Sequence, residues 1–308
     1  MELRQLRYFV RVCEAGSMGK AALDLGMATS ALSQQISRLE GELATRLLQR
    51  HATGVLPTDA GLAFLQQAQL TLRHAEDAVH AAQTARLSGR VSIGLASTTA
   101  SVLGVPLMHA MGQRYPAVRV HLVEALSGHL TTMLNARQLD LAILFRADGA
   151  RRWSVVPLLD EKLYVIGRPE LPGMPAGPRV RLSQLRDLPL ILPSPSHGLR
   201  ALVDAAFARQ RIAPCVHLEV DGLSLLMDAV RAGLGATIQP GAAAARLAAG
   251  EVRRVLVADA LTGRRNLLAS LSDDELSSAA LAARVVLGDV ARALVREGRW
   301  VGATLHKN

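Results

Sequence analysis

The sequence predicts an α/β protein with an all-α-type segment at its N-terminus, and three observations lead to this fold class. The chain has 308 residues, a length that favours about two domains over one. Apolar residues recur every three or four positions from Leu3 to Ala82, which is the period of an amphipathic helix. From Arg90 onward, short apolar runs alternate with helical stretches, as they do in α/β domains.

Residues 1–58 read as short helices followed by a hairpin. The first helix carries an apolar stripe and ends at Gly16, and Ser17 is a good N-cap for the second helix. The second helix stops at Gly26, and a very short turn leads into a third, so the pair forms a helix-turn-helix. Gly54 then marks a turn, which indicates a hairpin-like wing.

The third helix, over the stretch ATSALSQQISRLEGEL, has two unlike faces. One face carries Leu32, Ile36, Leu39 and Leu43, and the other carries Ser30, Ser33, Gln34 and Ser37. Such a polar face can enter the major groove of DNA, where Gln34 can form a bidentate pair with adenine. Arg38 and Arg50 would neutralise phosphates, which positions a protein without specifying a sequence. The alternative is an ordinary helical hairpin with a solvated polar face.

A long helix is predicted from about Asp59, with Thr58 as its cap, to Ala85. Its apolar residues form a seam with alternating spacings of three and four: Leu65, Ala68, Leu72, Ala75, Val79 and Ala82. A seam of this kind suits another helix, and we expect the same helix of a second chain. The alternative is a surface helix that packs on its own domain.

Beyond residue 88, apolar runs read as strands of a mainly parallel sheet. They begin at Arg90, Val118, Leu139, Lys162, Pro189, Val216 and Gly235. Asp273, Asp274 and Glu275 precede a late apolar helix. We interpret them as favourable charges at a solvated helix start rather than as a cation site.

Motifs for catalysis or metal binding are absent from the sequence. It has no GxSxG, Walker-type loop, HExxH, paired CxxC or strand-GxGxxG-helix unit, and its nine histidines are scattered. We therefore expect no enzyme activity, no metal and no cofactor. The two cysteines, Cys13 and Cys215, are too few for a disulfide framework, and Cys13 lies on an apolar face as a core thiol.

The charge and hydropathy of the chain limit which partners and which cellular location can be expected. The net charge of +9 would suit a polyanion. Residues 1–90, however, hold 10 basic and 8 acidic residues, whereas the remainder holds 25 basic and 18 acidic residues. Most of the excess positive charge therefore lies outside the N-terminal segment. The start MELRQLRYFV lacks the apolar region of a signal peptide, and no run reaches about 18 uncharged apolar residues. We expect a cytoplasmic protein with no membrane partner.

The segment from Leu6 to Gly61 resembles, without gaps, the winged helix-turn-helix of the LysR-type transcriptional regulators. The rest of the chain looks like the layout of that family. The runs ALSQQISRLEGEL and LPSPSHGLR are similar to its nitrogen-assimilation-control branch. The resemblance implies a DNA-binding domain over residues 1–58, a linker (dimerisation) helix over 59–87 and an effector-binding domain over 88–308.

The resemblance also implies which residues read DNA. The reading positions of the family fall on Thr29, Ser30, Ser33 and Gln34, with Ser37 and Arg38 on the same helix and Arg50 and Thr53 in the wing. Members usually carry Gln at the position of Thr29. Many carry a minor-groove Arg at the position of Thr53, and without it Arg50 stands as a basic residue of the wing, so the resemblance does not by itself imply minor-groove readout.

For the effector-binding domain, the resemblance implies a fold similar to the periplasmic binding proteins. Lobe one would span 91–161 and 266–300, and lobe two 162–265. A small anion or carboxylate would bind in the interlobe cleft at polar groups near strand ends. These are Ser97, Thr98, Thr99, Ser127, Phe145, Ser196, His197 and Thr237. For any hydroxyl among them, the alternative is helix capping.

The function implied is a sequence-specific regulator that binds double-stranded promoter DNA as a homodimer or homotetramer and places RNA polymerase under the control of a small-molecule effector. Some relatives sense peroxide through two cysteines in the effector domain, but this domain holds only Cys215, which disfavours such a switch within one chain. Two other classes stay open from the residues alone. They are a solute-binding protein whose N-terminal helices serve dimerisation, and an enzyme with a pocket in the α/β part.

Overall fold

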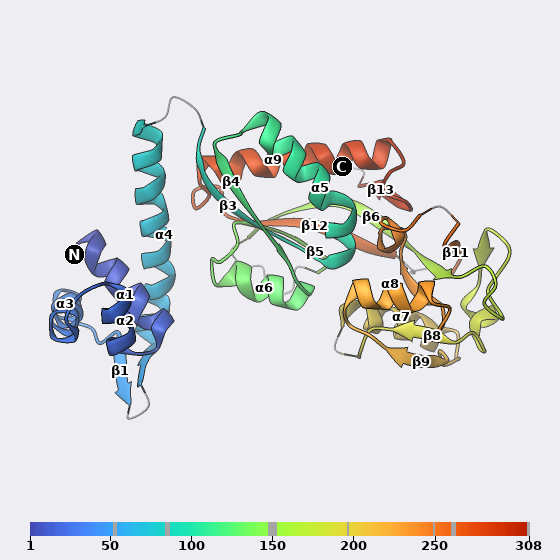
Figure 1. Ribbon diagram of the computed structural model, residues 1–308, viewed down its shortest axis with the longest axis horizontal. Coiled ribbons are helices and arrows are strands. Elements are labelled where there is room, and N and C mark those ends of the chain that lie inside the picture. Colours follow the sequence, from blue (N-terminus) through green and yellow to red (C-terminus); the bar gives the residue numbers. More distant parts are fainter. Residues whose placement is uncertain are drawn as a thin grey trace. The chain divides into compact units, whose positions relative to one another are not determined.

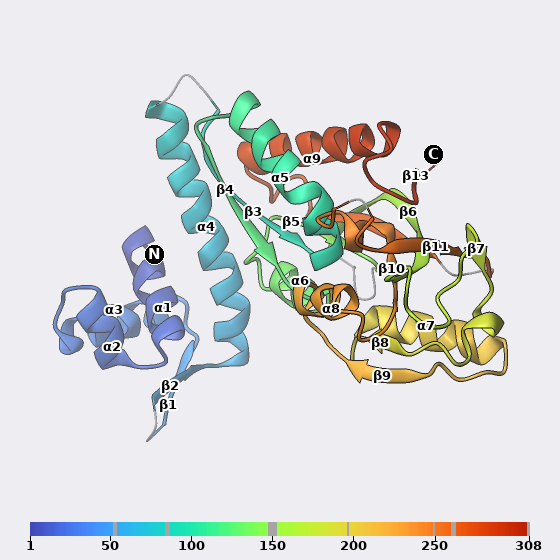
Figure 2. The same ribbon diagram turned by 45° about the vertical axis from the view of Figure 1, so that its right-hand side comes forward.

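The computed structural model describes residues 1–51, 54–83, 87–146, 153–195, 197–248, 250–259 and 263–306. The chain divides into two compact units, Met1–Gly89 and Arg90–Asn308 (Figures 1 and 2), and each is described by itself. Among the described residues, none of the helices is long and apolar enough to cross a lipid bilayer.

The N-terminal unit contains three short helices, a β-hairpin and a long helix (Figure 1). They are α1 (Leu3–Ala15), α2 (Met18–Asp24), α3 (Thr29–Glu42), β1 (Leu48–His51), β2 (Gly54–Pro57) and α4 (Asp59–Gln83). Gly16 ends α1 in the left-handed conformation, and the Ser17 hydroxyl caps α2 by accepting a hydrogen bond from the Lys20 N–H. Gly26, with a φ of 63°, turns the chain toward α3. The predicted winged helix-turn-helix is confirmed.

Apolar faces of these helices form the core of the unit. The Phe9 and Phe64 rings meet edge to face with centroids 5.2 Å apart, which joins α1 to α4. Cys13 packs against this core, and burial raises the pKa of its thiol to about 12. The prediction of a core thiol is therefore confirmed.

The apolar seam of α4 is used differently along its length. Ala68 is buried in the core of its own unit, and Leu65 and Leu72 pack partly against that core. The expectation that the whole seam faces a second chain is therefore wrong for its first half, because the seam also matches the apolar side of α1. Val79, in the second half of the seam, is by contrast 53% exposed.

The larger unit consists of two α/β lobes that share a nine-stranded sheet, and strands Leu190–Leu192 and Val216–Glu219 form a separate two-stranded sheet in the second lobe (Figure 1). In lobe one lie β3 (Gly89–Leu95), α5 (Ser97–Arg114), β4 (Val118–Glu124), α6 (Ser127–Asn135), β5 (Leu141–Leu144), β12 (Gly263–Leu271), α9 (Ser278–Arg296) and β13 (Ala303–Leu305). In lobe two lie β7 (Arg179–Val180), the 3-10 turn η1 (Leu182–Leu185), β8 (Leu190–Leu192), α7 (Gly198–Arg209), β9 (Val216–Glu219), α8 (Leu223–Arg231), β10 (Thr237–Pro240), the 3-10 turn η2 (Gly241–Ala244) and β11 (Arg253–Val257).

Strand β6 (Trp153–Gly167) runs through both lobes and connects them. Its first part, up to Lys162, pairs antiparallel with β12 in lobe one. Its last residues, from Leu163, pair with β10 and β11 in lobe two. The strand order is β4-β3-β5-β12-β6-β11-β7, and β10 and β13 also pair with β6. A change in the angle between the lobes must therefore act on β6 and its neighbours.

The expectation of a mainly parallel sheet is wrong. The pairs β3–β5, β7–β11 and β8–β9 are parallel, but β12 is antiparallel to both of its neighbours, and β10, β11 and β13 are antiparallel to β6. The strand predicted from Lys162 begins nine residues earlier, at Trp153, and strands β11 and β12 were not predicted. Charged residues such as Glu161 on β6 and Arg264 on β12 interrupt the apolar pattern of these strands. A prediction from hydropathy alone therefore misses them.

Arginine side chains form ion pairs with two of the acidic residues that precede α9. Asp273 lies 2.6 Å from Arg284, and Glu275 lies 2.5 Å from Arg137. The Ser277 hydroxyl caps α9 by accepting from the Ala280 N–H. No group of three or more His, Cys, Asp or Glu side chains suited to a metal ion occurs among the described residues.

Candidate DNA-recognition face and interlobe site

Helix α3 separates its two faces completely. Leu32, Ile36 and Leu39 are at most 2% exposed and hold the helix against the core. On the opposite side, Thr29, Ser30, Gln34, Ser37 and Arg38 are exposed, and Ser33 is half-buried. The structure thus brings the six predicted residues of α3 together on one accessible surface, which we call the α3 face.

The N-terminus of α3 supports an anionic partner. Its N-cap is Ala28, which has no side chain able to accept a hydrogen bond, so the first backbone N–H groups have no side-chain cap. Uncapped N–H groups and the helix dipole together favour a phosphate at such an end. Thr29 and Ser30 occupy this first turn, and their hydroxyls add donors beside it.

Arg38 lies at the other end of the α3 face. Its Nε is 3.2 Å from Glu42, and the Arg38 side chain is 60% exposed. The Glu42 carboxylate also accepts a hydrogen bond from the N-terminal ammonium of Met1, the main cause of the lowered pKa of this carboxyl. Exposed ion pairs of this kind add little stability, so Arg38 can exchange Glu42 for a phosphate at little cost.

The wing is the antiparallel hairpin of β1 and β2, and its backbone is anchored to α1. The Val55 N–H donates to the Gly16 carbonyl over 2.9 Å. A Cβ atom at Gly54 would come within 2.5 Å of that same carbonyl oxygen, and the φ of Gly54 is 148°, so glycine is required here. Arg50 is the backbone partner of Val55 in the hairpin, while Thr53 lies outside the described residues.

Glu40 connects α3 to the wing, a role that sequence reasoning missed. Its carboxylate is 7% exposed and accepts hydrogen bonds from the backbone N–H groups of Leu47, at 2.8 Å, and Leu48, at 3.0 Å. Arg46 adds an ion pair at 3.2 Å. The signal was present in the sequence, because Glu40 stands four residues after Ile36 on the apolar stripe, where a charge needs a partner.

In the larger unit, a buried network joins predicted residues that lie far apart in the sequence. The Arg264 guanidinium donates to Glu161 over 2.8 Å and to the Thr98 hydroxyl, and it lies 3.8 Å from the centre of the Phe145 ring. The side chain of Arg264 is 7% exposed and that of Glu161 is 0% exposed. Arg264 thus gathers Thr98 and Phe145, although sequence reasoning did not single it out.

Glu161 is the centre of this network. Besides Arg264, it accepts hydrogen bonds from Asn266 Nδ2 at 2.9 Å and from the Trp300 indole N–H at 2.8 Å. Asn266 in turn accepts a bond from the Thr99 hydroxyl over 3.5 Å. The Glu161 carboxylate thus accepts hydrogen bonds from three side chains, and Glu161 and Arg264 form a compensated buried pair next to the first turn of α5.

The remaining predicted effector residues are placed as follows. Ser97, Thr98 and Thr99 occupy the first turn of α5, and Ser127 begins α6. The N-caps of these helices are Ala96 and Leu126, so capping is the wrong explanation for the four hydroxyls. Thr237 is fully buried at the start of β10, and its hydroxyl has no hydrogen-bond partner among the described residues. Ser196 lies outside the described residues.

His197 does act as a helix cap. Its Nδ1 accepts the Leu199 N–H of α7 over 3.1 Å, which requires that nitrogen to be unprotonated. Burial is the main cause that lowers the pKa of His197. The charge of Arg264 lowers it further, and Asp221 opposes both. Arg264 therefore contributes to the lowered pKa of His197 and also donates to Thr98 and Glu161.

Comparison with known proteins decides the family. A model of the LysR substrate binding domain matches residues 84–292, and a model of the bacterial regulatory helix-turn-helix of the lysR family matches residues 3–62. The chain belongs to the LysR family of transcriptional regulators. It is therefore a LysR-type regulator with a helix-turn-helix and an effector-binding domain.

One relative of similar sequence and two similar solved structures add to this family assignment. The nitrogen assimilation regulatory protein nac of Klebsiella aerogenes is 38% identical over 250 residues, 80% of this chain and 81% of that protein, which confirms the resemblance to this branch. A full-length OxyR variant from Pseudomonas aeruginosa has the same fold, with a TM-score of 0.75 at 23% identity over 100% of this chain and 99% of its own. Full-length CbnR in complex with its target DNA matches with a TM-score of 0.56 at 23% identity, over 94% of this chain and 100% of its own.

Proposed function

We propose that this LysR-type regulator reads promoter DNA through the α3 face. The observation that carries the proposal is the opposite burial of the two sides of α3, which leaves serine hydroxyls and the Gln34 amide accessible while leucines anchor the helix from behind. A helix held in this way can enter the major groove with its N-terminal turn leading. Gln34 would pair with adenine, and Thr29, Ser30 and Ser33 would approach neighbouring base edges.

Phosphate contacts would position this helix on the duplex. We assign them to Ser37 and Arg38 on α3, to Arg50 and Thr53 of the wing, and to the uncapped first turn of α3. Because such contacts release counterions, the logarithm of the affinity should fall with the logarithm of salt concentration, and each lost phosphate contact should reduce that slope by about one.

Fluorescence anisotropy with labelled duplex DNA from the region upstream of the gene tests the α3 face. Ser33→Ala combined with Gln34→Ala should weaken specific binding about 10- to 100-fold, because a bidentate pair contributes about 1–3 kcal/mol of discrimination. Gln66→Ala, an exposed glutamine on α4 of the same unit, is the matched control and should bind as the wild type. Equal affinity of the double variant and the control would remove the α3 face from the account.

We further propose that a small anion or carboxylate binds in the interlobe cleft and modulates promoter binding. The uncapped first turn of α5, with Ser97, Thr98 and Thr99, offers N–H and hydroxyl donors beside the Arg264 guanidinium. His197, Ser127, Phe145, Ser196 and Thr237 complete the proposed contacts. An effector carboxylate would take over donors that Thr98 and Arg264 use now, and so would favour one arrangement of the lobes over the other.

Two adjacent arginines on β12 allow an experiment that distinguishes ligand binding at the proposed site from a nonspecific effect of charge. Arg264 is buried in the network, whereas its neighbour Arg265 is 54% exposed and pairs with Asp160. A thermal-shift screen of small monocarboxylates and oxyanions against the full-length protein should find a stabilising compound whose effect is lost in Arg264→Lys and kept in Arg265→Lys. A stabilising compound that acts equally on both variants would contradict the assigned site.

The rest of the proposed mechanism concerns assembly and output. We propose a homodimer or homotetramer that grips paired half-sites, with the exposed second half of the α4 seam, around Val79, as one contact between chains. A shift of the lobes would change the spacing of the DNA-binding units and the bend of the promoter, and so the placement of RNA polymerase. The protein would act in the cytoplasm and would have no catalytic role, in keeping with relatives that are regulators.

A further inference from the structure

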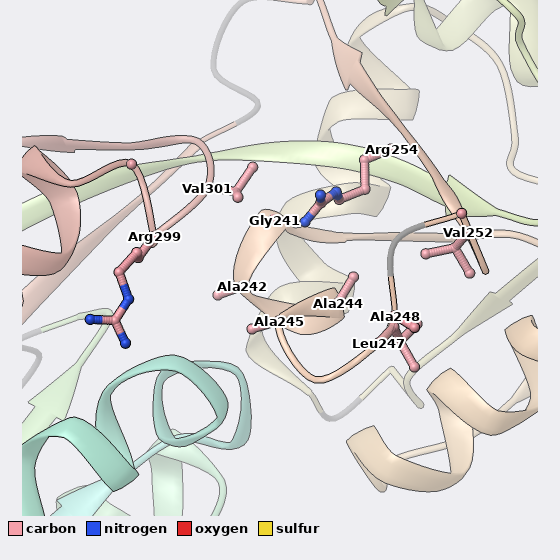
Figure 3. Close-up of a pocket in the computed structure, with 12 residues that line it drawn as sticks. Gly241, Ala242, Ala244, Ala245, Leu247, Ala248, Val252, Arg254, Arg299 and Val301 are labelled. Carbon is pink, nitrogen blue, oxygen red and sulfur yellow. The ribbon is translucent and has the colours of Figure 1, made fainter.

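A cavity of the larger unit lies outside the network of Arg264 and Glu161. It has a volume of about 280 Å³ and is lined by η2, the segment after η2, strand β11 and the turn between α9 and β13 (Figure 3). Its floor consists of glycine and alanine residues, and Leu247, Val252 and Val301 add apolar walls. The charged groups of its lining are two arginines, Arg254 and Arg299.

Among the described residues, neither of these guanidiniums is held in a buried ion pair, unlike that of Arg264. Within the part of the chain that the structure describes, the Arg254 guanidinium makes no hydrogen bond or ion pair, and Figure 3 shows its side chain extending toward η2. Arg299 reaches Glu297 over 3.3 Å, but the side chains are 60% and 54% exposed. Such an exposed pair is readily exchanged for another anion.

The cavity lies where the two lobes are connected. Arg254 comes from β11, where it pairs with Ile166 in the lobe-two part of β6. Arg299 follows α9 of lobe one and precedes β13, which pairs with the middle of β6. A ligand that contacts both guanidiniums would therefore link the two lobes beside their shared strand.

The η2 turn that forms the floor is itself packed on lobe one. The Ser101 hydroxyl of α5 donates to the Ala242 carbonyl over 2.9 Å. A Cβ atom at Gly241 would come within 2.4 Å of the Val301 carbonyl oxygen, so no side chain fits between these segments. These contacts hold the floor against lobe one, and the small side chains of the floor leave the cavity open.

We propose that this cavity binds a small organic dianion with a short aliphatic body, of which a four- or five-carbon dicarboxylate is the simplest form. Two guanidiniums from different elements call for an anionic group at each end of the ligand, since each can hold one carboxylate by paired N–H donors. The alanine, leucine and valine walls accept methylene groups, and the volume limits the ligand to a small metabolite. This site shares no lining residue with the proposed interlobe contacts and does not depend on an effector binding there.

Isothermal titration of the full-length protein with succinate and glutarate tests the proposal, with propionate and inorganic phosphate as comparison probes. Binding of a dicarboxylate should be tighter than that of propionate or phosphate. It should weaken at least tenfold in Arg254→Gln and in Arg299→Gln. Arg253→Gln and Arg296→Gln change neighbouring arginines outside the cavity lining and should leave the affinity unchanged.

A variant that fills the cavity gives an independent readout. Ala245 lines the cavity at an exposed position with ordinary helical backbone angles, so Ala245→Glu places a carboxylate there without straining the chain. This variant should fold and should lose dicarboxylate binding. The proposal is overturned if neither dicarboxylate binds, if the cavity variants bind as the wild type does, or if Arg264→Lys alone abolishes binding, since the ligand would then lie in the interlobe cleft.

Discussion

The α3 face and the interlobe network both carry polar side chains, but they hold them in opposite ways. On α3, the predicted contact residues are mostly exposed, the helix start has no side-chain cap, and Arg38 has a partner that it can exchange. Around Glu161, by contrast, the donors are buried and already bonded to one another. A partner could bind the first surface without displacing internal bonds, whereas a ligand at the second would have to displace them.

This difference suits a regulator that binds DNA and responds to a ligand. A surface that meets phosphates and base edges pays little desolvation of its own polar groups, since water covers them until the duplex arrives. A ligand that competed with internal bonds at the proposed interlobe site would shift the protein toward the arrangement that binds it better. Variants of the two regions should therefore affect different properties.

The largest effect is expected at the centre of the network. Glu161→Ala should lower the free energy of unfolding of the larger unit by about 3–5 kcal/mol, because it leaves Arg264 buried without its carboxylate. Both tryptophans, Trp153 and Trp300, belong to this unit, so tryptophan fluorescence during urea unfolding reports its stability alone. Asp160→Ala, the exposed neighbour, should cost less than about 1 kcal/mol. Similar losses in the two variants would mean that the network adds no special stability.

A smaller effect is expected where α3 meets the wing. Glu40→Ala should cost about 1–3 kcal/mol, because it leaves the Leu47 and Leu48 N–H groups without their acceptor. Glu40→Gln keeps one oxygen for those groups and should cost less. Hydrogen exchange at the two amides measures the effect locally, with Glu42→Ala, a surface ion-pair variant, as control. Unchanged protection in Glu40→Ala would show that the wing is held by other contacts.

The smallest effect concerns pH. The pKa of His197 is lowered from its ordinary value of 6.5, so the unfolded chain binds a proton more readily than the folded chain does. The stability from this residue is therefore fully present above pH 6.5. It is lost as the pH falls below that value, until the lowered pKa of the folded state is passed. Melting temperatures between pH 7.5 and pH 5, followed by tryptophan fluorescence, should show a smaller decline in His197→Asn, which caps α7 without titrating. Parallel declines in both proteins would contradict this role.

The sequence allowed much of the N-terminal unit to be predicted, because the determining signals are local. Gly16, Ser17 and Gly26 mark the ends of helices, and the period of Leu32, Ile36 and Leu39 identifies the buried side of α3. The α4 seam shows the limit of this reasoning. Periodicity says that Leu65 and Ala68 face something apolar, but not whether that surface belongs to the same chain.

The interlobe network could not be predicted in the same way. Arg264 and Glu161 are 103 residues apart and meet only because β12 pairs with β6. Each charge breaks the apolar pattern of its strand, so the feature that creates the network also hides the strands that carry it. The turns with Thr98 and Phe145 were found from strand ends, but the group that joins them was not.

The most direct test of the central claim is a selection of binding sites from randomised duplex DNA with the wild type and Gln34→Arg. Glutamine pairs with adenine and arginine with guanine in the major groove, and Gln34 is exposed on the α3 face. The account predicts that one position of each half-site changes from adenine to guanine while the other positions stay the same. Identical preferences for the two proteins would contradict the claim that the α3 face reads the sequence.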